Sequence, residues 1–346
     1  MNSQITTVGV DLAKNVIQVC KVEDNQVLFN RSMKPAQFAQ WLCTEKPCRV
    51  VFESCSTSNY WKQLATSYGH DAKLISAQLV ESVRQHQKND RNDALAIVQA
   101  AQLPAVCFIA GKTIEQQQLQ STLRLRELAV KQKTALSNQL KAILLEFNIR
   151  TGGKISLKVA IQSTLENGEN ELSHLFRMAL DHAWKQYLQI VNVIQIYDDG
   201  LNQFVSTNPQ CKKFMRLEGV GIINAINLYL AFYASDEEEC RSARSAAARF
   251  GLTPIQHSSG GKSSIGSIGR HVKNTIVRSQ LITGAFTYVN HLEKRDPKTE
   301  KDAWIKEMIK RRGKKCTAVA LANKTVRTAY AMVANQTNYQ AVTLTV

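Results

Sequence analysis

Residues 5–33 read ITTVGVDLAKNVIQVCKVEDNQVLFNRSM, and this stretch decides the fold. Three runs within it, 5–10, 16–22 and 27–32, contain all of its Val and Ile residues and are separated by short polar turns. Short apolar runs of this kind, bounded by Asp, Asn and Lys, are typical of consecutive β-strands. The stretch therefore predicts a three-stranded antiparallel meander at the start of the chain.

The segments that follow the meander alternate between helix and strand. A helix is predicted from Pro35, a strand at 49–53, a helix at 58–67 and a strand at 72–76. A meander followed by such an alternation is the element order of the ribonuclease H-like fold. We therefore predict an α/β domain over residues 1–110, with an all-α remainder.

Four carboxylates stand at positions that this fold would bring together. Asp11 ends the first apolar run and Glu53 ends the fourth, while Asp90 and Asp93 stand three apart where a helical pattern begins. Residues three apart share one face of a helix. A cluster of carboxylate oxygens suits Mg²⁺, which usually works beside substrate phosphates. The plainer alternative is that each acid is an ordinary turn or helix-start residue.

Two long helical patterns occupy the middle of the chain, 113–149 and 171–205. At about 1.5 Å per residue the first would be roughly 55 Å long. A Gly-containing break between them predicts an antiparallel hairpin, or a coiled coil that also makes a dimer contact over residues 111–208. A helical core packed within one chain is the equal alternative.

The positive charge is concentrated near the C-terminus. The 346 residues carry a net charge of +16, and residues 211–346 hold 22 Lys and Arg against 10 Asp and Glu, which gives +12 there. Segregated charge of this size favours a polyanion partner, DNA or RNA, over a merely soluble surface.

Two glycine-containing stretches in this basic region are candidate phosphate contacts. Residues 217–225 have the pattern of a helix-hairpin-helix, in which Gly219 and Gly221 would let backbone amides approach a phosphate. Residues 257–270 read HSSGGKSSIGSIGR and predict a Gly/Ser loop between two helices, with Lys262, Arg270 and Lys273 beside its hydroxyls. A hydroxyl beside basic groups suits a nucleophile that attacks a phosphodiester. A flexible linker is the alternative, and the pattern alone does not select one serine.

Helices are predicted at 271–292, 299–311 and 316–334. The last two are split by a basic turn that we expect to contact phosphates. Its candidate residues are Arg311, Arg312, Lys314 and Lys315.

Nothing in the sequence suggests a membrane, disulfide or zinc protein. The eight cysteines are scattered without CxxC pairs, so we expect reduced thiols. No apolar run approaches a membrane span, and the start enters a strand without a signal peptide, so a cytoplasmic protein is expected.

These motifs together resemble the DEDD-type transposases of bacterial insertion sequences. The resemblance rests on VGVDLAKN at 8–15, ESC at 53–55, KNDRNDA at 88–94, GLTP at 251–254 and HSSGGK at 257–262, and covers nearly the whole chain. Within these transposases, the chain resembles the serine-dependent, RNA-guided bridge recombinases, which are related to the pilin-gene invertase. Among them it resembles the subgroup with the HSSGGK loop.

The resemblance implies an N-terminal RuvC-like domain in which Asp11, Glu53, Asp90 and Asp93 hold Mg²⁺. It implies a C-terminal transposase domain over 209–346 whose catalytic serine is Ser259. That serine would form a transient phosphoserine link to DNA, and strands would pass between donor and target DNA paired with a noncoding guide RNA. The family's site is built from two subunits, so a homodimer that assembles to a tetramer is implied, associated with the bacterial nucleoid.

Two other functions remain open from the residues alone. A RuvC-like Holliday-junction endonuclease would use the acids to activate water and would tolerate the loss of Ser259. A decayed, non-catalytic nucleic-acid-binding protein is the third possibility, against which the four acids argue.

Overall fold

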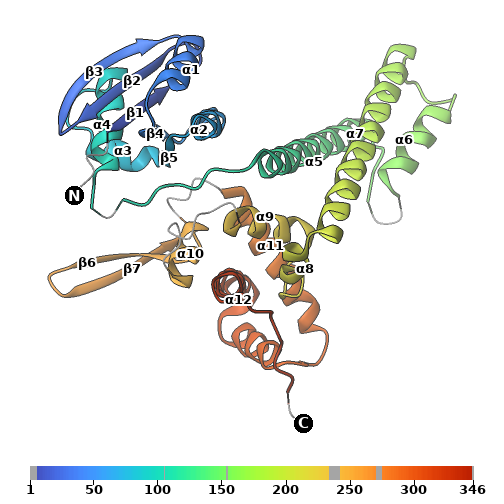
Figure 1. Cartoon of the computed structure of the whole chain (residues 1–346). Coiled ribbons are helices and arrows are strands. Elements are labelled where there is room, and N and C mark those ends of the chain that lie inside the picture. Colours follow the sequence, from blue (N-terminus) through green and yellow to red (C-terminus); the bar gives the residue numbers. More distant parts are fainter. Residues whose placement is uncertain (1–5, 105, 153–154, 234–241, 270–274, 345–346) are drawn as a thin grey trace. The chain divides into compact units, whose positions relative to one another are not determined.

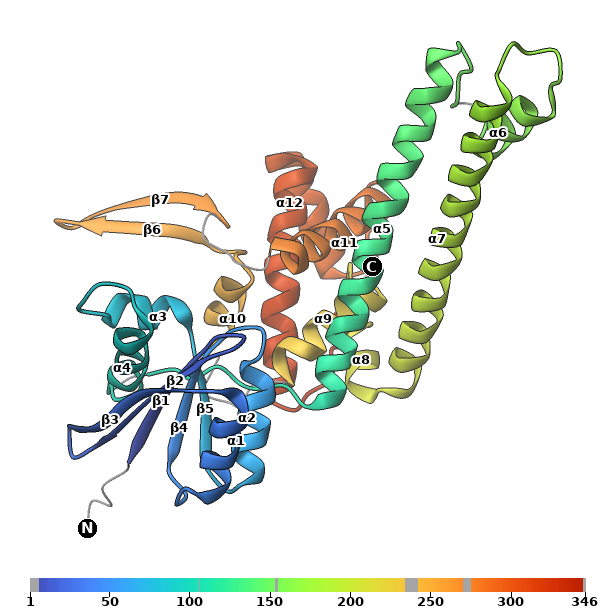
Figure 2. The same cartoon turned by 90° about the horizontal axis from the view of Figure 1, so that it is seen from above.

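The computed structural model describes residues 6–104, 106–152, 155–233, 242–269 and 275–344. Its residues form two compact units, 1–116 with 228–346 and 117–227. Figures 1 and 2 show the elements from two directions. No helix among the described residues is long and apolar enough to cross a membrane. The seven cysteines described are all free thiols.

A five-stranded sheet organises the N-terminal part, in the order β3-β2-β1-β4-β5 (Figure 1). β1 pairs antiparallel with β2, and β2 with β3, whereas β4 lies parallel to both β1 and β5. The predicted mixed α/β class is confirmed, and the order is consistent with the predicted ribonuclease H-like domain. The elements are β1 (Thr7–Leu12), β2 (Ile17–Glu23), β3 (Gln26–Met33), α1 (Pro35–Thr44), β4 (Arg49–Glu53), α2 (Ser58–Ser67), β5 (Asp71–Ile75), α3 (Ala77–Val83) and α4 (Asp90–Ala101).

Both faces of this sheet are covered. On one face Val8, Val10 and Phe52 pack with Phe38 of α1 and Trp61 of α2. On the other face the buried cores contain residues of β2, β4 and β5 together with α3 and α4. The alternation of buried side chains along each strand produces this three-layer arrangement.

Gly9 allows α4 to approach the sheet closely. A Cβ at this position would lie 2.4 Å from the carbonyl oxygen of Ala94 and 2.7 Å from Cγ2 of Val98. Asp11 lies two residues further along β1, on the same face as Gly9. One helical turn before Ala94 comes Asp90, so the contact at Gly9 brings the start of α4 toward Asp11.

The second unit contains two long helices, α5 (Ile114–Glu146) and α7 (His174–Thr207), and the shorter α6 (Leu157–Glu166), which the sequence did not predict. Arg126 of α5 forms an ion pair with Asp198 of α7, with Nε to Oδ1 at 2.5 Å. Farther along α5, Leu140 and Leu144 share a buried cluster with Leu180 and Trp184. Because positions advance along α5 as they recede along α7, the two helices are antiparallel, as in the predicted hairpin.

Short helices and a hairpin precede the last two helices. These elements are α8 (Pro209–Phe214), α9 (Ile222–Phe232), α10 (Ala243–Arg249), β6 (Pro254–Ser259), β7 (Lys262–Ile268), α11 (Thr275–Glu293) and α12 (Glu300–Ala334). The predicted split near residue 313 is present as a kink inside α12, where Gly313 has φ 76° and ψ 167°. This backbone region is essentially restricted to glycine.

The prediction of a Gly/Ser loop at 257–270 was wrong for its described part. Residues 254–268 form an antiparallel β-hairpin in which Ser259 pairs with Lys262 across the turn. Gly260 and Gly261 occupy the turn with φ of 55° and 76°. Two consecutive positive φ values make the two-residue turn whose twist matches paired strands. The glycines therefore favour a hairpin here, even though the strands contain few core-forming residues.

Candidate functional site

The register of the sheet places the first two predicted acids side by side. Val10 of β1 pairs with Phe52 of the parallel strand β4. One residue further along each strand come Asp11 and Glu53. Neighbouring parallel strands keep equivalent residues adjacent, so both carboxylates lie at the same edge of the sheet.

The other two acids lie in the first turn of α4. Asn89 caps this helix by accepting a hydrogen bond from the Asn92 amide at 2.8 Å. The cap fixes the helix start, so Asp90 and Asp93 both fall in its first turn. Asp90 is exposed and Asp93 is buried.

The other three carboxylates act electrostatically on Asp11. Burial, followed by the negative charges of Glu53, Asp90 and Asp93, raises the pKa of Asp11 from 3.8 to about 6. Both causes disfavour a charged carboxylate. A bound cation would therefore stabilise the charged form of this acid cluster.

Asp93 has a cationic partner that the sequence analysis missed. Arg84 donates from Nη1 to Oδ1 of Asp93 at 2.9 Å, and both side chains are largely buried. Arg84 is the C-cap residue of α3, in the connection that leads to α4. No spacing pattern links residues 84 and 93, so only the tertiary contact identifies the pair.

A polar network beside the acids was also missed. Gln18, which pairs with Asp11 across β1 and β2, is buried. Its amide donates to Asn30 at 2.7 Å and accepts from Ser32 at 2.6 Å. Asn30 in turn donates to the carbonyl of Arg91 at 2.8 Å, which ties β3 to the start of α4. Gln18, a polar residue within the apolar run 16–22, was the sequence feature that could have indicated this network.

The oxygen donors of the four acids match the ligand preference of Mg²⁺. Among the described residues, no three His, Cys, Asp or Glu side chains are spaced to hold a metal ion. Four carboxylates nevertheless supply only hard oxygen donors, and burial, followed by repulsion from the other three acids, raises the pKa of Asp11, so a bound cation would favour its charged form. The donor chemistry therefore fits a magnesium ion, which Asp93 would bind in place of Arg84.

Ser259 lies at the end of the exposed hairpin. Its strand neighbours are exposed, and Lys262 is its cross-strand partner. The hydroxyl of Ser258 accepts a hydrogen bond from Gln256 at 3.1 Å, whereas Ser259 forms none with the residues described. Ser259 therefore has an available hydroxyl with a lysine beside it.

The predicted phosphate contacts differ in their surroundings. Gly219 has φ 77° in the turn between α8 and α9, while Gly221 has open space around its Cβ position. Beside the kink, Lys314 is paired with Glu293 at 2.6 Å, and Arg311 contacts the sulfur of Met308 at 2.9 Å. The other basic candidates fall into two groups. Arg312 and Lys315 are exposed with no ion pair to a described residue, and Arg270 and Lys273 lie outside the described residues.

Two family profiles match the chain. One, described as a transposase, covers residues 8–149, and the other, described as the transposase IS116/IS110/IS902 family, covers residues 211–301. The transposase for insertion sequence element IS1111A of Coxiella burnetii is 32% identical over 97% of this chain and 92% of that protein. The chain belongs to the IS116/IS110/IS902 family of transposases.

Other relatives of this transposase align over nearly the full length. A probable family 20 transposase of Pseudomonas aeruginosa is 32% identical over 97% of the chain and 99% of its own length. The transposase for insertion sequence element IS1328 of Yersinia enterocolitica is 29% identical over 96% and 98%. The expected insertion-sequence transposase is thereby confirmed, and with it a DNA-recombining enzyme that acts on DNA.

Proposed function

We propose that this transposase exchanges DNA strands through a transient phosphoserine bond made by Ser259. The observation that carries the proposal is an exposed serine hydroxyl beside Lys262 at a hairpin turn, in a chain that also has an acid cluster around Asp11. A hydroxyl nucleophile and an electrostatic site for a phosphate are the two components of phosphoryl transfer.

The proposed step is a balanced exchange of phosphodiesters. A bond forms between Oγ of Ser259 and the DNA phosphorus as a phosphorus–oxygen bond of the strand breaks. The proton of the serine passes overall to the released strand oxygen. A second DNA end then reverses the step, and this restores the serine hydroxyl without consuming a nucleotide cofactor.

Chain residues position the phosphate. Lys262 lies across the turn from Ser259 and favours a phosphate oxygen near the nucleophile. Asp11, Glu53, Asp90 and Asp93 would hold Mg²⁺, which when bound supplies Lewis-acid stabilisation of the phosphoryl group. Gln18 and Asn30 fix the start of α4 and with it the two helix acids.

We further infer a two-subunit site and a guide RNA, as the family resemblance implies. Exposed apolar side chains on α5 and α7, among them Leu125, Leu128, Leu188 and Ile196, support a helix-mediated dimer that pairs into a tetramer. The excess of basic residues in 211–346 supports binding of an RNA that pairs with donor and target DNA.

Covalent trapping tests the proposal. The protein, its candidate noncoding RNA and end-labelled element-junction DNA are incubated with Mg²⁺ and separated on a denaturing gel. Wild type is expected to give a labelled protein–DNA band that Ser259→Ala and Asp11→Ala both lose, while Ser258→Ala, the neighbouring hydroxyl, retains it. Free cleaved DNA that persists in Ser259→Ala would instead identify a metal-dependent Holliday-junction type of endonuclease.

A further inference from the structure

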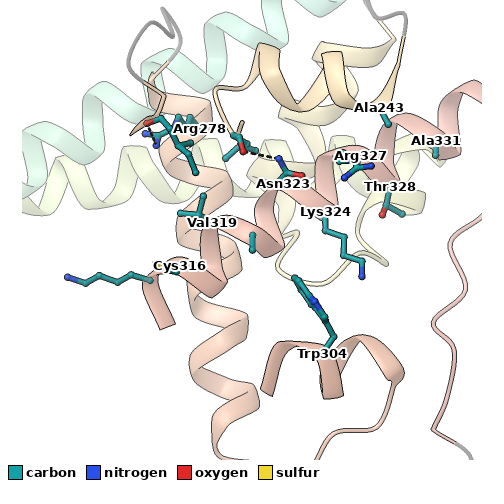
Figure 3. Close-up of a pocket in the computed structure, with 14 residues that line it drawn as sticks. Ala243, Arg278, Trp304, Cys316, Val319, Asn323, Lys324, Arg327, Thr328 and Ala331 are labelled. Carbon is teal, nitrogen blue, oxygen red and sulfur yellow. Dashed lines mark hydrogen bonds between the residues drawn. The ribbon is translucent and has the colours of Figure 1, made fainter. Parts of the chain in front are cut away.

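A pocket of about 980 Å³ lies in the C-terminal helical part, and neither Ser259 nor any of the four acids lines it (Figure 3). It is lined by residues of α10, α11 and α12 and by the end of β7. We call it the Trp304 pocket. Its volume is at the upper end of the range of about 300–1,000 Å³ that is usual for small-molecule sites.

The kink in α12 creates one wall of the Trp304 pocket. Gly313, with φ 76°, turns the two halves of α12 relative to each other. Trp304 from the first half thereby meets Lys324 from the second, whose Nζ lies 4.5 Å from the ring centroid. Figure 3 shows the lysine extending toward the indole. A straight helix would place residues 304 and 324 about 30 Å apart.

The charge of the pocket is entirely positive. Its 14 lining residues include Arg278, Lys315, Lys324 and Arg327, and none of them is acidic. Arg278 is committed to the backbone carbonyls of Gly251 and Ile268, at 3.1 and 3.4 Å. Lys315 and Arg327 are exposed and have no ion pair with a described residue, so they are available to an anion.

Most of the other lining residues are apolar or aromatic. Leu252, Val319 and Ala320 contribute apolar surface, and Trp304 contributes an indole ring. Asn323 donates to the carbonyl of Leu252 at 2.8 Å, which fixes α12 against the segment before the hairpin. An occupant must therefore combine a flat apolar part with several negative charges around it.

We propose that the Trp304 pocket binds one unpaired nucleotide of single-stranded DNA. The base stacks on Trp304, and the flanking phosphates bind Lys315, Lys324 and Arg327. Stacking on aromatic rings combined with basic groups along the backbone is how single strands are bound. A base within a duplex is stacked between its neighbours and cannot enter such a pocket.

The choice of DNA follows from the activity of the enzyme. A transposase acts on DNA, and the strand exchange of the proposed function, on which this inference rests, leaves DNA ends unpaired. Lys324 is exposed, and the four-carbon stem of a lysine is flexible, so its ammonium can leave the indole for a phosphate as the base arrives. The ring face that the ammonium now covers would then be free for the base.

Equilibrium binding in the Ser259→Ala background, without Mg²⁺, tests the proposal separately from the chemistry. The probes are labelled single-stranded oligothymidylate and an abasic oligomer with the same phosphates. Trp304→Ala is expected to weaken oligothymidylate binding by about 5- to 100-fold and to leave the abasic oligomer unchanged. Trp304→Phe, which retains a ring, should recover most of the affinity.

A charge-matched pair of variants tests the phosphate contacts. Lys324→Gln should weaken both oligomers and reduce the slope of log affinity against log salt by about 0.7. Lys310→Gln removes the same charge from an exposed position of α12 outside the pocket and should change affinity less than about twofold.

Three results would overturn the proposal. They are unchanged oligothymidylate binding in Trp304→Ala, an equal loss for the oligothymidylate and abasic oligomers, and tighter Trp304-dependent binding of oligouridylate, which would make the pocket an RNA site. A failure of covalent trapping with the Trp304-dependent binding intact would reject the phosphoserine mechanism alone.

Discussion

Gly9→Ala should weaken the sheet domain and displace the acids together. A Cβ at residue 9 would lie 2.4 Å from the oxygen of Ala94 and 3.1 Å from the nitrogen of Val98, both backbone atoms of α4. Backbone atoms cannot rotate away as a side chain end can, so the helix must move by about 1 Å. Overpacking of this kind costs about 1–3 kcal/mol, and contact with backbone favours the upper value.

The net loss of stability in Gly9→Ala is smaller than the free-energy cost of the clash. Replacing Gly by Ala restricts the unfolded chain and returns about 1 kcal/mol. A cost of about 3 kcal/mol less this gain leaves about 2 kcal/mol, which is roughly a 30-fold change in the unfolding constant. Because α4 carries Asp90 and Asp93, the same shift should lower recombination by more than stability alone predicts, up to about 100-fold.

Native-state hydrogen exchange measures the effect where it arises, because amide protection reports the local free energy of opening. Protection of the β1 and β4 amides should fall about 30-fold in Gly9→Ala. The matched control is Gly200→Ala within α7, where nothing but the adjoining backbone of the same helix lies near the added Cβ. It should raise protection of α7 by up to about fivefold, from about 1 kcal/mol of helix propensity, and leave β1 unchanged. Protection of β1 within threefold of wild type in Gly9→Ala would refute the close-packing argument.

Three further predictions concern charge and polar contacts. Mg²⁺ at 100 times its dissociation constant should stabilise the protein by about 2.7 kcal/mol above pH 6. The stabilisation should be smaller at pH 5, where a proton competes with the ion for Asp11, and absent in Asp11→Asn. Thermal unfolding with and without EDTA measures these differences. Asn30→Ala removes the hydrogen bond to the Arg91 carbonyl and should weaken Mg²⁺ affinity about tenfold in the same titration. Asn167→Ala, a change within the second unit, should leave that affinity unchanged. Asp302 is 1% exposed, and burial acts to raise its pKa. Three hydrogen bonds outweigh burial and hold that pKa below its usual 3.8; they come from Tyr288 Oη at 2.7 Å, the Lys298 amide and Arg295. The stabilisation from Asp302 is therefore full above the usual pKa and is lost as the pH falls through the lower pKa of the folded protein. Asp302→Asn should cost about 3 kcal/mol at pH 7 and flatten the fall in stability measured from pH 7 down to about 2. An unchanged fall over this range would contradict the assignment.

Local patterns in the sequence determined most of the elements. The strand at 49–53 and the helix at 58–67 were predicted with the bounds that β4 and α2 have, because apolar runs and helical spacing set these elements residue by residue. The long helices α5 and α7 were predicted within a few residues for the same reason. The sequence also predicted the positions of the four acids, two at strand ends and two at a helix start, although their roles stay predictions.

At the hairpin 254–268, local composition led to a wrong prediction of a loop. Its exposed, hydroxyl-rich strands lack the apolar alternation on which strand prediction depends. The signal was in the turn, since Gly260-Gly261 favours paired strands by its backbone conformation and not by burial.

Tertiary structure alone decided the contacts that give these elements their chemistry. The ion pair of Arg84 with Asp93, the tie from Asn30 to Arg91 and the meeting of Trp304 with Lys324 join residues whose spacing carries no periodic signal. Each depends on how whole elements pack, and packing depends on single atoms such as the missing Cβ of Gly9 and the glycine-only backbone of Gly313. The sequence by itself determined the elements and their charges, whereas the distances between side chains came from the close packing of those elements in three dimensions.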